Sequence, residues 1–229
     1  MPVTPGMRKS TRGDEVHARL RSDILAGRLQ PGQRLKFPDL CERYEASVGV
    51  TREALARLVG QGLVRSENHQ GYLVTPLSED DLADLTAARL EIETLAFRHS
   101  VTDGDVEWEA QVVSAHHVLA RTPLTDPDDS ARMSDEWARV HGAFHDTLLA
   151  GCGNRRLLHI ARALRAEADL YQRWSVSLSG ERGRDIAAEH RGLLDAAMAR
   201  DPDLAVERLR EHIGHTRELL VDYQRAQVE

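Results

Sequence analysis

The sequence predicts a mostly α-helical protein, with an N-terminal winged helix-turn-helix and a C-terminal antiparallel all-helical bundle. Three observations indicate this fold class. Two helical segments near the N-terminus are separated by a short break, a stretch with the alternation of a β-hairpin follows them, and every later segment has helical periodicity only. With 229 residues the chain also exceeds the ~100 to 200 residues usual for one domain, so we expect two domains.

The winged helix is expected at residues 14–76, after a flexible tail at residues 1–13 that is rich in Pro, Gly and basic side chains. Apolar residues at helical spacing predict the first helix, and the Pro-Gly turn in the segment LQPGQRL separates it from the next one. The helices of this domain are expected at about 14–26, 37–44 and 50–61. Apolar and polar residues then alternate in Leu63–Ser66 and Tyr72–Thr75 around a polar tip with Gly71, which predicts a hairpin, the wing.

The C-terminal domain is expected at residues 77–229 and shows helix signals only. Capping patterns that begin at Ser78 and Thr102, and Asp201 directly before a proline, mark the starts of helices. The stretch Thr122–Asp129, rich in Pro and Asp, is expected to be a loop between helices. The helices are expected at about 79–100, 103–121, 128–150, 155–178, 182–199 and 202–226.

Charge is divided unevenly along the chain, whose formal net charge is −7. Residues 1–76 contain 12 Lys and Arg against 8 Asp and Glu, whereas the remainder contains 18 against 29. A basic segment on an acidic protein favours a polyanion such as DNA as its partner, because Lys and Arg that neutralise phosphates release counterions. A lopsided solvated surface would give the same count, so charge alone leaves both interpretations open.

The remaining composition indicates an intracellular protein. Cys41 and Cys152 lie far apart and lack the CxxC spacing of a zinc or redox site, which favours a reducing cytoplasm. The first ten residues have no apolar stretch like that of a signal peptide, and no run of ~18 apolar residues could span a membrane. We therefore expect a cytoplasmic protein without a membrane partner.

Candidate DNA-binding residues lie at the start of the second helix of the helix-turn-helix. In this motif the first turn of that helix reaches base edges in the major groove. Its buried face is expected to consist of Ala54, Leu55, Leu58 and Val59. Ser47, Thr51 and Arg52 are then left near the exposed start, where the planar guanidinium of Arg52 could pair with guanine or phosphate. Arg52 and Arg57 could equally be solvated side chains of a surface helix.

Four histidines in the C-terminal half have a spacing that fits a metal site. His141 and His145 are four residues apart and share one helix face, while His190 and His212 lie in two other predicted helices that carry apolar stripes. Three helices could thus bring four imidazoles into one core, and imidazole is a common ligand of Zn, Ni, Cu and Fe. Histidine pairs at this spacing also occur at surfaces and in hydrogen-bonded cores, and His215 could compete with His212.

The N-terminal segment resembles the GntR winged helix over roughly residues 14–76. The resemblance rests on LQPGQRL, the pair Leu35 and Leu40, the REAL-x-x-L block that starts at Arg52, the GLV after it, and Gly71. It implies a homodimer on double-stranded operator DNA, with Ser47 and Arg52 near the backbone or bases. It also places the wing tip in the minor groove. The DNA-binding candidates are therefore Ser47, Thr51, Arg52, Arg57, His69, Gln70 and Gly71.

One residue departs from the pattern of that family. Many members carry an arginine directly after the serine of the turn, and this chain has Val48 there. A protein without that guanine-seeking side chain takes its sequence information from other contacts. The operator sequence of the family therefore does not transfer to this chain.

The segment from Ser78 to Ala226 resembles the FCD ligand-binding domain of the FadR-type GntR subfamily, an all-helical bundle. The matching landmarks are Arg89-x3-Glu93, Phe144-His145 followed by Gly153-Asn154, Glu189-His190, and His212. Metal-binding members use an Asp-x3-His pair and two later histidines. The implied metal ligands here are His141, in the place of the aspartate, His145, His190 and His212.

The exchange of aspartate for His141 makes the ligand set all-nitrogen and removes a negative charge, which favours a divalent transition metal, Zn or Ni above all, over Mn or Mg. Such an ion with open positions could hold a small organic acid as effector. Arg89 and Asn154 are the candidate effector-binding residues. For Arg89 an internal salt bridge with Glu93 is the alternative.

We expect a DNA-binding transcription regulator, not an enzyme, whose operator affinity is controlled by a small carboxylate-type effector bound near a metal in the C-terminal domain. Two alternatives stay open at this point. The histidine cluster could belong to a metal-dependent, hydrolase-like enzyme with Glu189 or Asp146 as base, although no HExxH, GxSxG or P-loop motif is present. The bundle could also serve dimerisation alone.

Overall fold

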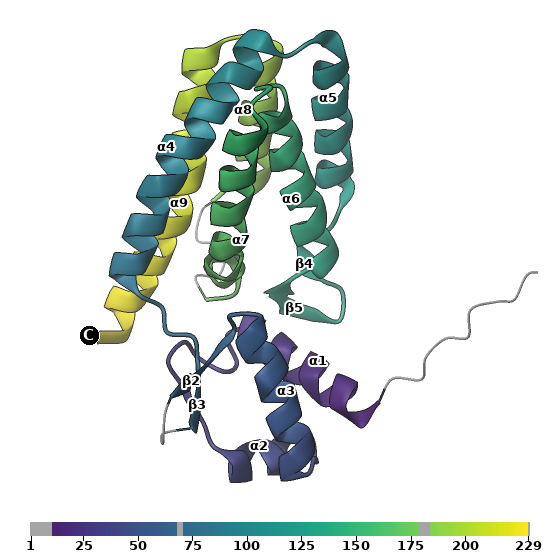
Figure 1. Cartoon of the computed structure of the whole chain (residues 1–229), viewed down its shortest axis with the longest axis vertical. Coiled ribbons are helices and arrows are strands. Elements are labelled where there is room, and N and C mark those ends of the chain that lie inside the picture. The colour runs from purple at the N-terminus through teal and green to yellow at the C-terminus, as the bar shows by residue number, and fades with distance from the viewer. Residues whose placement is uncertain (1–10, 68–70, 179–183, 229) are drawn as a thin grey trace, which may run out of the picture. The chain divides into compact units, whose positions relative to one another are not determined.

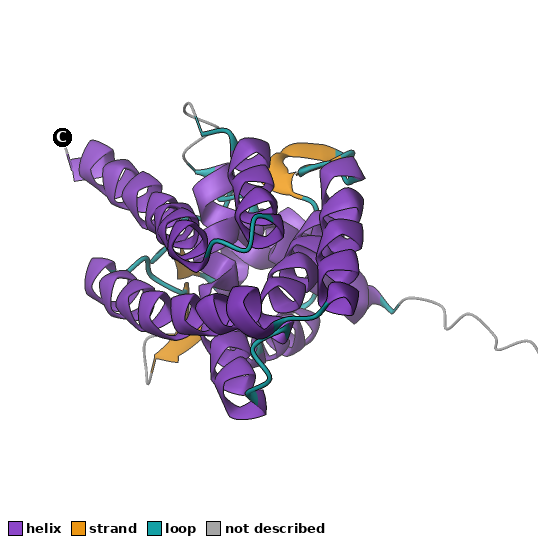
Figure 2. Ribbon diagram, turned by 90° about the horizontal axis from the view of Figure 1, so that it is seen from above, coloured by secondary structure: helices purple, strands orange, loops and turns teal. Residues whose placement is uncertain are grey.

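The computed structural model describes residues 11–67, 71–178 and 184–228, and the chain divides into two compact units, Met1–Leu77 and Ser78–Glu229 (Figure 1). Helices predominate throughout, as Figure 2 shows, and the predicted fold class is confirmed. The first unit combines three helices with a small sheet, and the second unit is a helical bundle with one short hairpin.

The helices of the N-terminal unit are α1 (Arg12–Leu25), α2 (Phe37–Tyr44) and α3 (Val48–Gly60). Helix α1 begins two residues before the predicted start, because Thr11 forms a capping box with Asp14. The Thr11 hydroxyl oxygen accepts from the Asp14 backbone N–H at 3.2 Å, and the Asp14 carboxylate accepts from the Thr11 backbone N–H at 3.1 Å. Of the predicted flexible tail, residues 1–10 lie outside the described residues.

A three-stranded antiparallel sheet completes this unit, with strands in the order β1-β3-β2. Strands β2 (Val64–Glu67) and β3 (Gly71–Val74) are the hairpin that the alternation predicts. Strand β1 (Arg34–Leu35) pairs with β3 and was not predicted, because two residues are too few to show a periodicity.

The buried face of α3 differs from the predicted one at two positions. Ala54, Leu55 and Leu58 are buried as predicted, but Val59 is 36% exposed and Thr51 is fully buried. Thr51 precedes Ala54 by three residues and Leu58 by seven, so the helical period places it on their face, whereas Val59 lies at the edge of that face. The prediction of an exposed Thr51 is therefore wrong.

The helices of the C-terminal unit are α4 (Glu79–Asp103), α5 (Val106–Arg121), α6 (Asp135–Ala150), α7 (Arg155–Ser177), α8 (Ile186–Met198) and α9 (Pro202–Val228). Helix α4 packs along α9 and also contacts α6 and α7, while α5 packs on α6 and α8. The predicted cap at Ser78 is present, because its hydroxyl accepts from the Asp81 N–H. The start predicted at Thr102 is wrong: α4 continues through it, and Asp105 caps α5 instead.

The prediction that this domain is entirely helical needs one correction. Strands β4 (Thr125–Asp126) and β5 (Asp129–Met133) form a hairpin where a loop and the start of a helix were expected. The Asp126 carboxylate holds the turn, because it accepts from the Asp128 backbone N–H at 2.9 Å and pairs with Arg132. Helix α6 then begins at Asp135, after the cap at Ser134.

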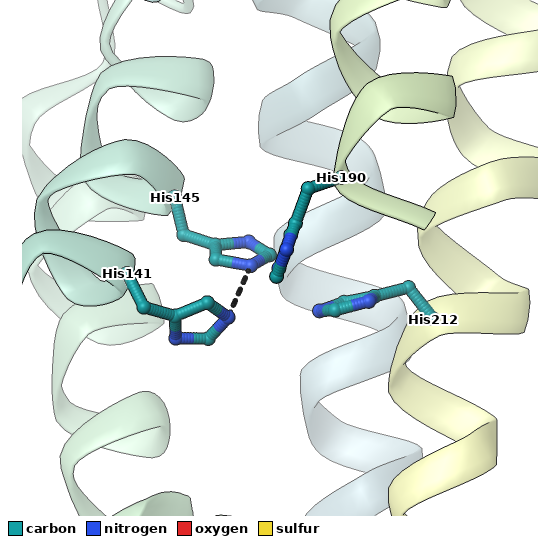
Figure 3. Close-up of side chains that lie close together, drawn as sticks. All are labelled: His141, His145, His190 and His212. Carbon is teal, nitrogen blue, oxygen red and sulfur yellow. Dashed lines mark hydrogen bonds between the residues drawn. The ribbon is translucent and has the colours of Figure 1, made fainter. Parts of the chain in front are cut away.

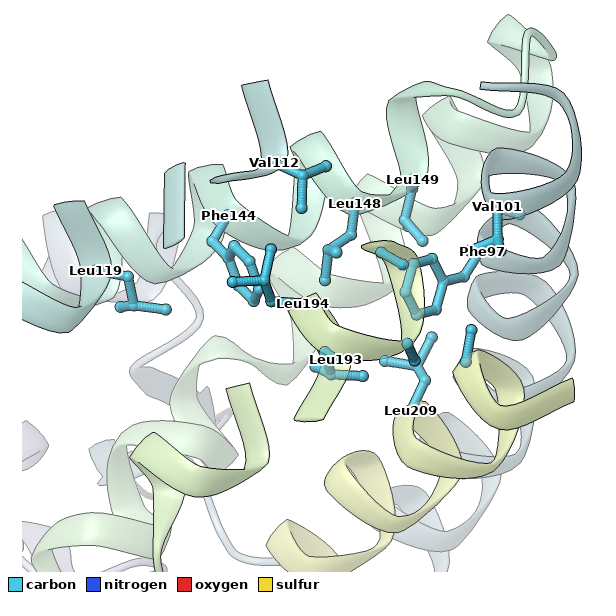
Figure 4. Close-up of a cluster of buried hydrophobic side chains, with 14 of the residues drawn as sticks. Phe97, Val101, Val112, Leu119, Phe144, Leu148, Leu149, Leu193, Leu194 and Leu209 are labelled. Carbon is cyan, nitrogen blue, oxygen red and sulfur yellow. The ribbon is translucent and has the colours of Figure 1, made fainter. Parts of the chain in front are cut away.

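The core of the bundle lies between α4, α5, α6, α8 and α9. Figure 4 shows side chains from these five helices that point toward one another. The labelled members are Phe97, Val101, Val112, Leu119, Phe144, Leu148, Leu149, Leu193, Leu194 and Leu209, all of them buried. Their burial is the main driving force for the fold of this domain.

Replacing Gly104 with alanine is expected to destabilise the core at the α4–α5 corner by about 1 to 3 kcal/mol, because the added methyl group has no room. Its Cβ would lie 2.4 Å from Trp108 Cε3 and 2.5 Å from the Ser100 carbonyl oxygen. The Trp108 ring is held in place, since its Nε1 donates to the Thr147 carbonyl at 2.9 Å. Thermal melts check this expectation against the control Gly214→Ala, whose Cβ meets nothing within 4 Å and which should melt no lower than the parent.

Candidate functional site

Four histidine side chains meet inside the C-terminal bundle. His141 and His145 come from α6, His190 from α8 and His212 from α9, and Figure 3 shows their rings pointing at one another. Each offers a nitrogen, and these four nitrogens all lie within 4.8 Å of one another. Every one of these side chains is at most 5% exposed. The structure thus brings together all four histidines that the sequence singles out.

Helix α6 sets the position of two of these rings. Because it starts at the Ser134 cap, its inward face carries Trp137, His141 and His145, which are spaced by one turn each. The Trp137 ring stacks on His141 with 4.5 Å between ring centroids and 13° between planes. The Nε2 atoms of His141 and His145 lie 3.0 Å apart. Aromatic packing therefore fixes this pair against the rest of the core.

Burial keeps the cluster neutral. It lowers the pKa of His141, His145 and His190 well below the ordinary value of an imidazole, and the neighbouring histidines and arginines add to this effect. Burial also lowers the pKa of His212, although a hydrogen bond to Glu189 opposes it. Neutral imidazoles have a free lone pair, which is the form that binds a metal ion.

The residues present fit a transition-metal ion. Among the described residues His190 Nε2 is buried without any hydrogen-bond partner, as expected of a nitrogen that awaits a ligand to its lone pair. Two nitrogens on one ion lie at most about 4.2 Å apart, given metal–nitrogen bonds of about 2.1 Å. The 4.8 Å limit on the nitrogen spacing means that the widest pair has to close by at most about 0.6 Å around an ion.

A carboxylate outside the cluster touches one of the four rings. Glu189 Oε2 lies 2.7 Å from His212 Nδ1, and Glu189 Oε1 lies 2.8 Å from His215 Nδ1. Arg184 donates to both carboxylate oxygens, at 2.8 and 2.7 Å. Burial alone would raise the pKa of Glu189, yet the hydrogen bonds from His212 and Arg184 hold it well below its ordinary value. The sequence indicates Glu189 only as a possible base, because its contacts with His212 and His215 depend on how α8 packs against α9.

His215 is not a member of the cluster. Its side chain is 45% exposed and is engaged with Glu189. A groove of about 720 Å³ runs along α8 and α9, and Glu189, His212 and His215 all line it. His212 is therefore the member of the cluster that faces this groove, together with its carboxylate partner Glu189.

Two arginines lie near the cluster and share a buried glutamate. Arg89 Nε donates to Glu93 Oε1 at 2.6 Å, and Glu93 has no exposed side-chain surface. Arg165 lies 3.9 Å from the other oxygen of Glu93, and it also bonds to Asp146 at 2.8 Å. The alternative considered for Arg89, a salt bridge with Glu93, is thus present. Arg165 was not predicted, because its proximity depends on how α7 packs.

Asn154, the other candidate for effector binding, has a different role. Its side chain is exposed and caps α7, where its amide oxygen accepts from the backbone N–H groups of Arg156 and Leu157, both at 3.1 Å. Because its amide oxygen caps a helix at the surface, the expected role of Asn154 in effector binding is corrected to helix capping.

The start of α3 presents some of the predicted DNA-binding residues. Ser47 is exposed and caps α3 by accepting from the Val50 N–H. Arg52 is exposed, with its guanidinium 5.3 Å from the centroid of the Phe37 ring. Thr51 is buried with its hydroxyl 3.6 Å from Cys41 Sγ, so its expected contact with DNA is corrected to a packing role.

The other predicted DNA-binding residues have mixed outcomes. Arg57 pairs with Asp14 at 2.8 Å and thereby ties α3 to the start of α1. Gly71 is exposed at the start of β3 with a φ of +90°, a conformation that favours glycine. His69 and Gln70 lie outside the described residues.

The fold defines a class: a winged helix with a basic sequence, joined to a helical domain, is the organisation of a DNA-binding regulator. In the part of the chain that is described, no helix has both the length and the apolar character needed to cross a membrane.

Comparisons with known proteins agree with this class. Residues 12–74 match the family model of bacterial regulatory proteins of the gntR family, and residues 84–215 match that of the FCD domain. The HTH-type transcriptional regulator BphR of Paraburkholderia xenovorans is 39% identical over 195 residues, which cover 85% of this chain and 79% of BphR. The HTH-type transcriptional repressor GlaR of Escherichia coli is 38% identical over 198 residues, covering 85% of this chain and 89% of GlaR.

A solved structure of a GntR family regulator from Pseudomonas syringae pv. tomato is similar in fold, with a TM-score of 0.55 and 27% sequence identity. The match covers 94% of this chain and 87% of the Pseudomonas chain. The chain belongs to the GntR family of DNA-binding transcription regulators and carries an FCD domain. It is a regulator and not an enzyme, so the hydrolase-like alternative is set aside.

Proposed function

We propose that this protein is a FadR-type repressor that binds its operator as a homodimer and responds to a small carboxylate held near a divalent metal ion in the FCD domain. The observation that carries the proposal is the convergence of four buried imidazoles from three helices. Among the described residues His190 Nε2 is buried without a hydrogen-bond partner, and a buried polar atom of this kind destabilises the fold unless a ligand binds it. The relative GlaR is a transcriptional repressor, which supports repression as the sign of regulation.

The donor set favours Zn or Ni. All four candidate ligands are nitrogens, whereas Mg and Mn prefer the oxygen of carboxylates and water. The ion would be held by His141, His145, His190 and His212, and when bound it would supply positive charge and any coordination positions that the protein leaves open. The chain's own residues hold the rings in place and leave each of them at most 5% exposed to water.

The charges around the site favour an anionic effector. Four neutral imidazoles leave both charges of a divalent ion uncompensated. The two nearby carboxylates cannot compensate them, because Glu189 is paired with Arg184 and Glu93 is paired with Arg89. A buried net positive charge is costly, and an acid that binds there would remove that cost. Arg89 and Arg165 are neutralised by their carboxylate partners, so their contribution would be direct hydrogen bonds from guanidinium N–H groups to the same anion.

Effector binding in the FCD domain can change operator affinity if both binding events favour particular arrangements of the dimer. An effector that binds better to one arrangement of the two winged helices in a dimer shifts the population toward it. Coupling of ~1 to 3 kcal/mol is typical of such regulators and changes operator affinity by about 5- to 150-fold.

Operator binding should respond to at least one small carboxylate only when the protein is loaded with Zn or Ni. The probe is a DNA fragment selected from genomic fragments that the purified protein retains, and the readout is an electrophoretic titration with and without each acid. Arg89→Lys keeps the charge beside Glu93 but loses the planar fork, so it should weaken the response to the acid by about tenfold or more.

Arg98→Ala is the matched control, because this arginine lies on the same helix but is 43% exposed and pairs with Asp203. It should leave the response to the acid unchanged. Equal operator affinity with every acid in the panel, in metal-loaded protein, would instead favour a domain that serves dimerisation alone.

A further inference from the structure

We propose that Glu189 is the positioning residue of the metal site: it holds His212 in the tautomer whose Nε2 lone pair faces the cluster. The inference rests on the proposed metal function and adds a residue that the four ligands do not include. Glu189 lies one position before His190 on α8. The same helix therefore supplies the ligand His190 and the carboxylate that contacts the ring of His212.

The direction of the hydrogen bond decides the tautomer. Both oxygens of Glu189 accept from Arg184, the arrangement of a carboxylate that has only acceptors, so the 2.7 Å contact with His212 Nδ1 requires the proton to be on Nδ1. In a neutral ring the other nitrogen, Nε2, then carries the lone pair. His212 lies in the cluster with the other three rings, as Figure 3 shows, and Nε2 is the nitrogen left to face them.

The surroundings of Glu189 hold the carboxylate in one orientation. Arg184 bridges both of its oxygens and also donates to the His212 carbonyl at 3.1 Å and to Thr216 Oγ1 at 3.2 Å. His215 binds the oxygen that His212 does not use. Two partners besides His212, namely Arg184 and His215, thus hold the carboxylate with Oε2 toward His212. Carboxylates that orient ligating histidines in this way raise the basicity of the ring and improve metal affinity.

The same contacts explain why His215 does not replace His212 as a ligand. Both rings present Nδ1 to the one carboxylate, but His212 is buried and His215 is 45% exposed on the groove side. His215 therefore contributes to the orientation of Glu189, and His212 alone reaches the cluster.

The test compares Zn affinity of full-length variants by competition with a chromophoric chelator. Glu189→Ala should weaken Zn binding by about 10- to 100-fold, and Glu189→Gln by less, because the amide oxygen can still accept from Nδ1–H. Glu211→Gln is the matched control for Glu189→Gln. Glu211 also lines the groove and precedes His212 by one residue, but it pairs with Arg208 at 2.9 Å. It should bind Zn like the parent.

A second measurement separates positioning from a merely structural role. In the metal-free parent, side-chain ¹H–¹⁵N correlation spectra should show His212 protonated on Nδ1, and in Glu189→Ala this preference should be lost while the thermal melt shows a folded protein. Equal Zn affinity of Glu189→Ala and the parent, or a His212 protonated on Nε2 in the parent, would overturn the proposal. A parent that binds no Zn would overturn the proposed function instead, and the tautomer would still test the role of Glu189.

Discussion

Protein with both His145→Ala and His190→Ala is expected to bind no metal, whereas the parent, purified without an affinity tag, should contain about one ion per chain. The two substitutions remove one ligand from α6 and one from α8, and two remaining imidazoles cannot hold a divalent ion in competition with water and buffer. Elemental analysis of dialysed protein measures the ion content directly.

The control for this experiment is His99→Ala, because His99 lies on α4 with its side chain 51% exposed, outside the cluster. It should keep the parent's metal content. Since the double variant also loses packing in the core, the parent itself provides a second readout. Zn at about 100 times its dissociation constant should stabilise the parent by about 2.7 kcal/mol, and a chelator should reverse the gain. A parent without metal and without this stabilisation would contradict the site.

Replacing Arg52 with alanine is expected to weaken operator binding by about 1 to 3 kcal/mol, which is about 5- to 150-fold. Arg52 is exposed in the first turns of α3, with its guanidinium 5.3 Å from the centroid of the Phe37 ring. Electrophoretic titration at fixed salt measures the change. Arg139→Ala removes the same charge from an exposed side chain of α6 that pairs with Glu136, and it should bind the operator like the parent.

Arg52→Lys then distinguishes the two contacts that an arginine can make. If Arg52 binds phosphate, the lysine variant should retain most of the affinity, and the alanine variant should reduce the slope of log affinity against log salt by about 1. If Arg52 pairs with a guanine, the lysine variant should discriminate less between the four bases at one position of the operator. Unchanged affinity of the alanine variant would remove Arg52 from the interface.

Much of this molecule follows from periodicity in the sequence. The 3.6-residue repeat assigns each residue of a long helix to one face. For this reason His141 and His145 could be predicted to lie on the same helix face, and His190 and His212 to lie in helices with apolar stripes. The same rule, applied to Thr51, would have predicted its burial, since it is in register with Ala54 and Leu58.

Other features could not be predicted from the sequence for physical reasons. Strands β1 and β4 are two residues long, too short for an alternation to be visible. The contact of Glu189 with His212 joins two helices, and that of Arg165 with Glu93 joins two others, so both depend on how helices pack and not on spacing within one of them. The sequence thus indicates which residues face inward, and the tertiary structure decides which of them meet.

The origin of the four imidazoles in three separate helices has a consequence for chain entropy. An ion held by them would act as a cross-link: it would close one loop of chain from α6 through α7 to α8, and a second loop from α8 to α9. A cross-link that joins distant segments stabilises a fold mainly by restricting the unfolded chain. The final helix, which otherwise is held by side-chain packing and ion pairs, would then be fastened to the middle of the bundle by a coordination bond.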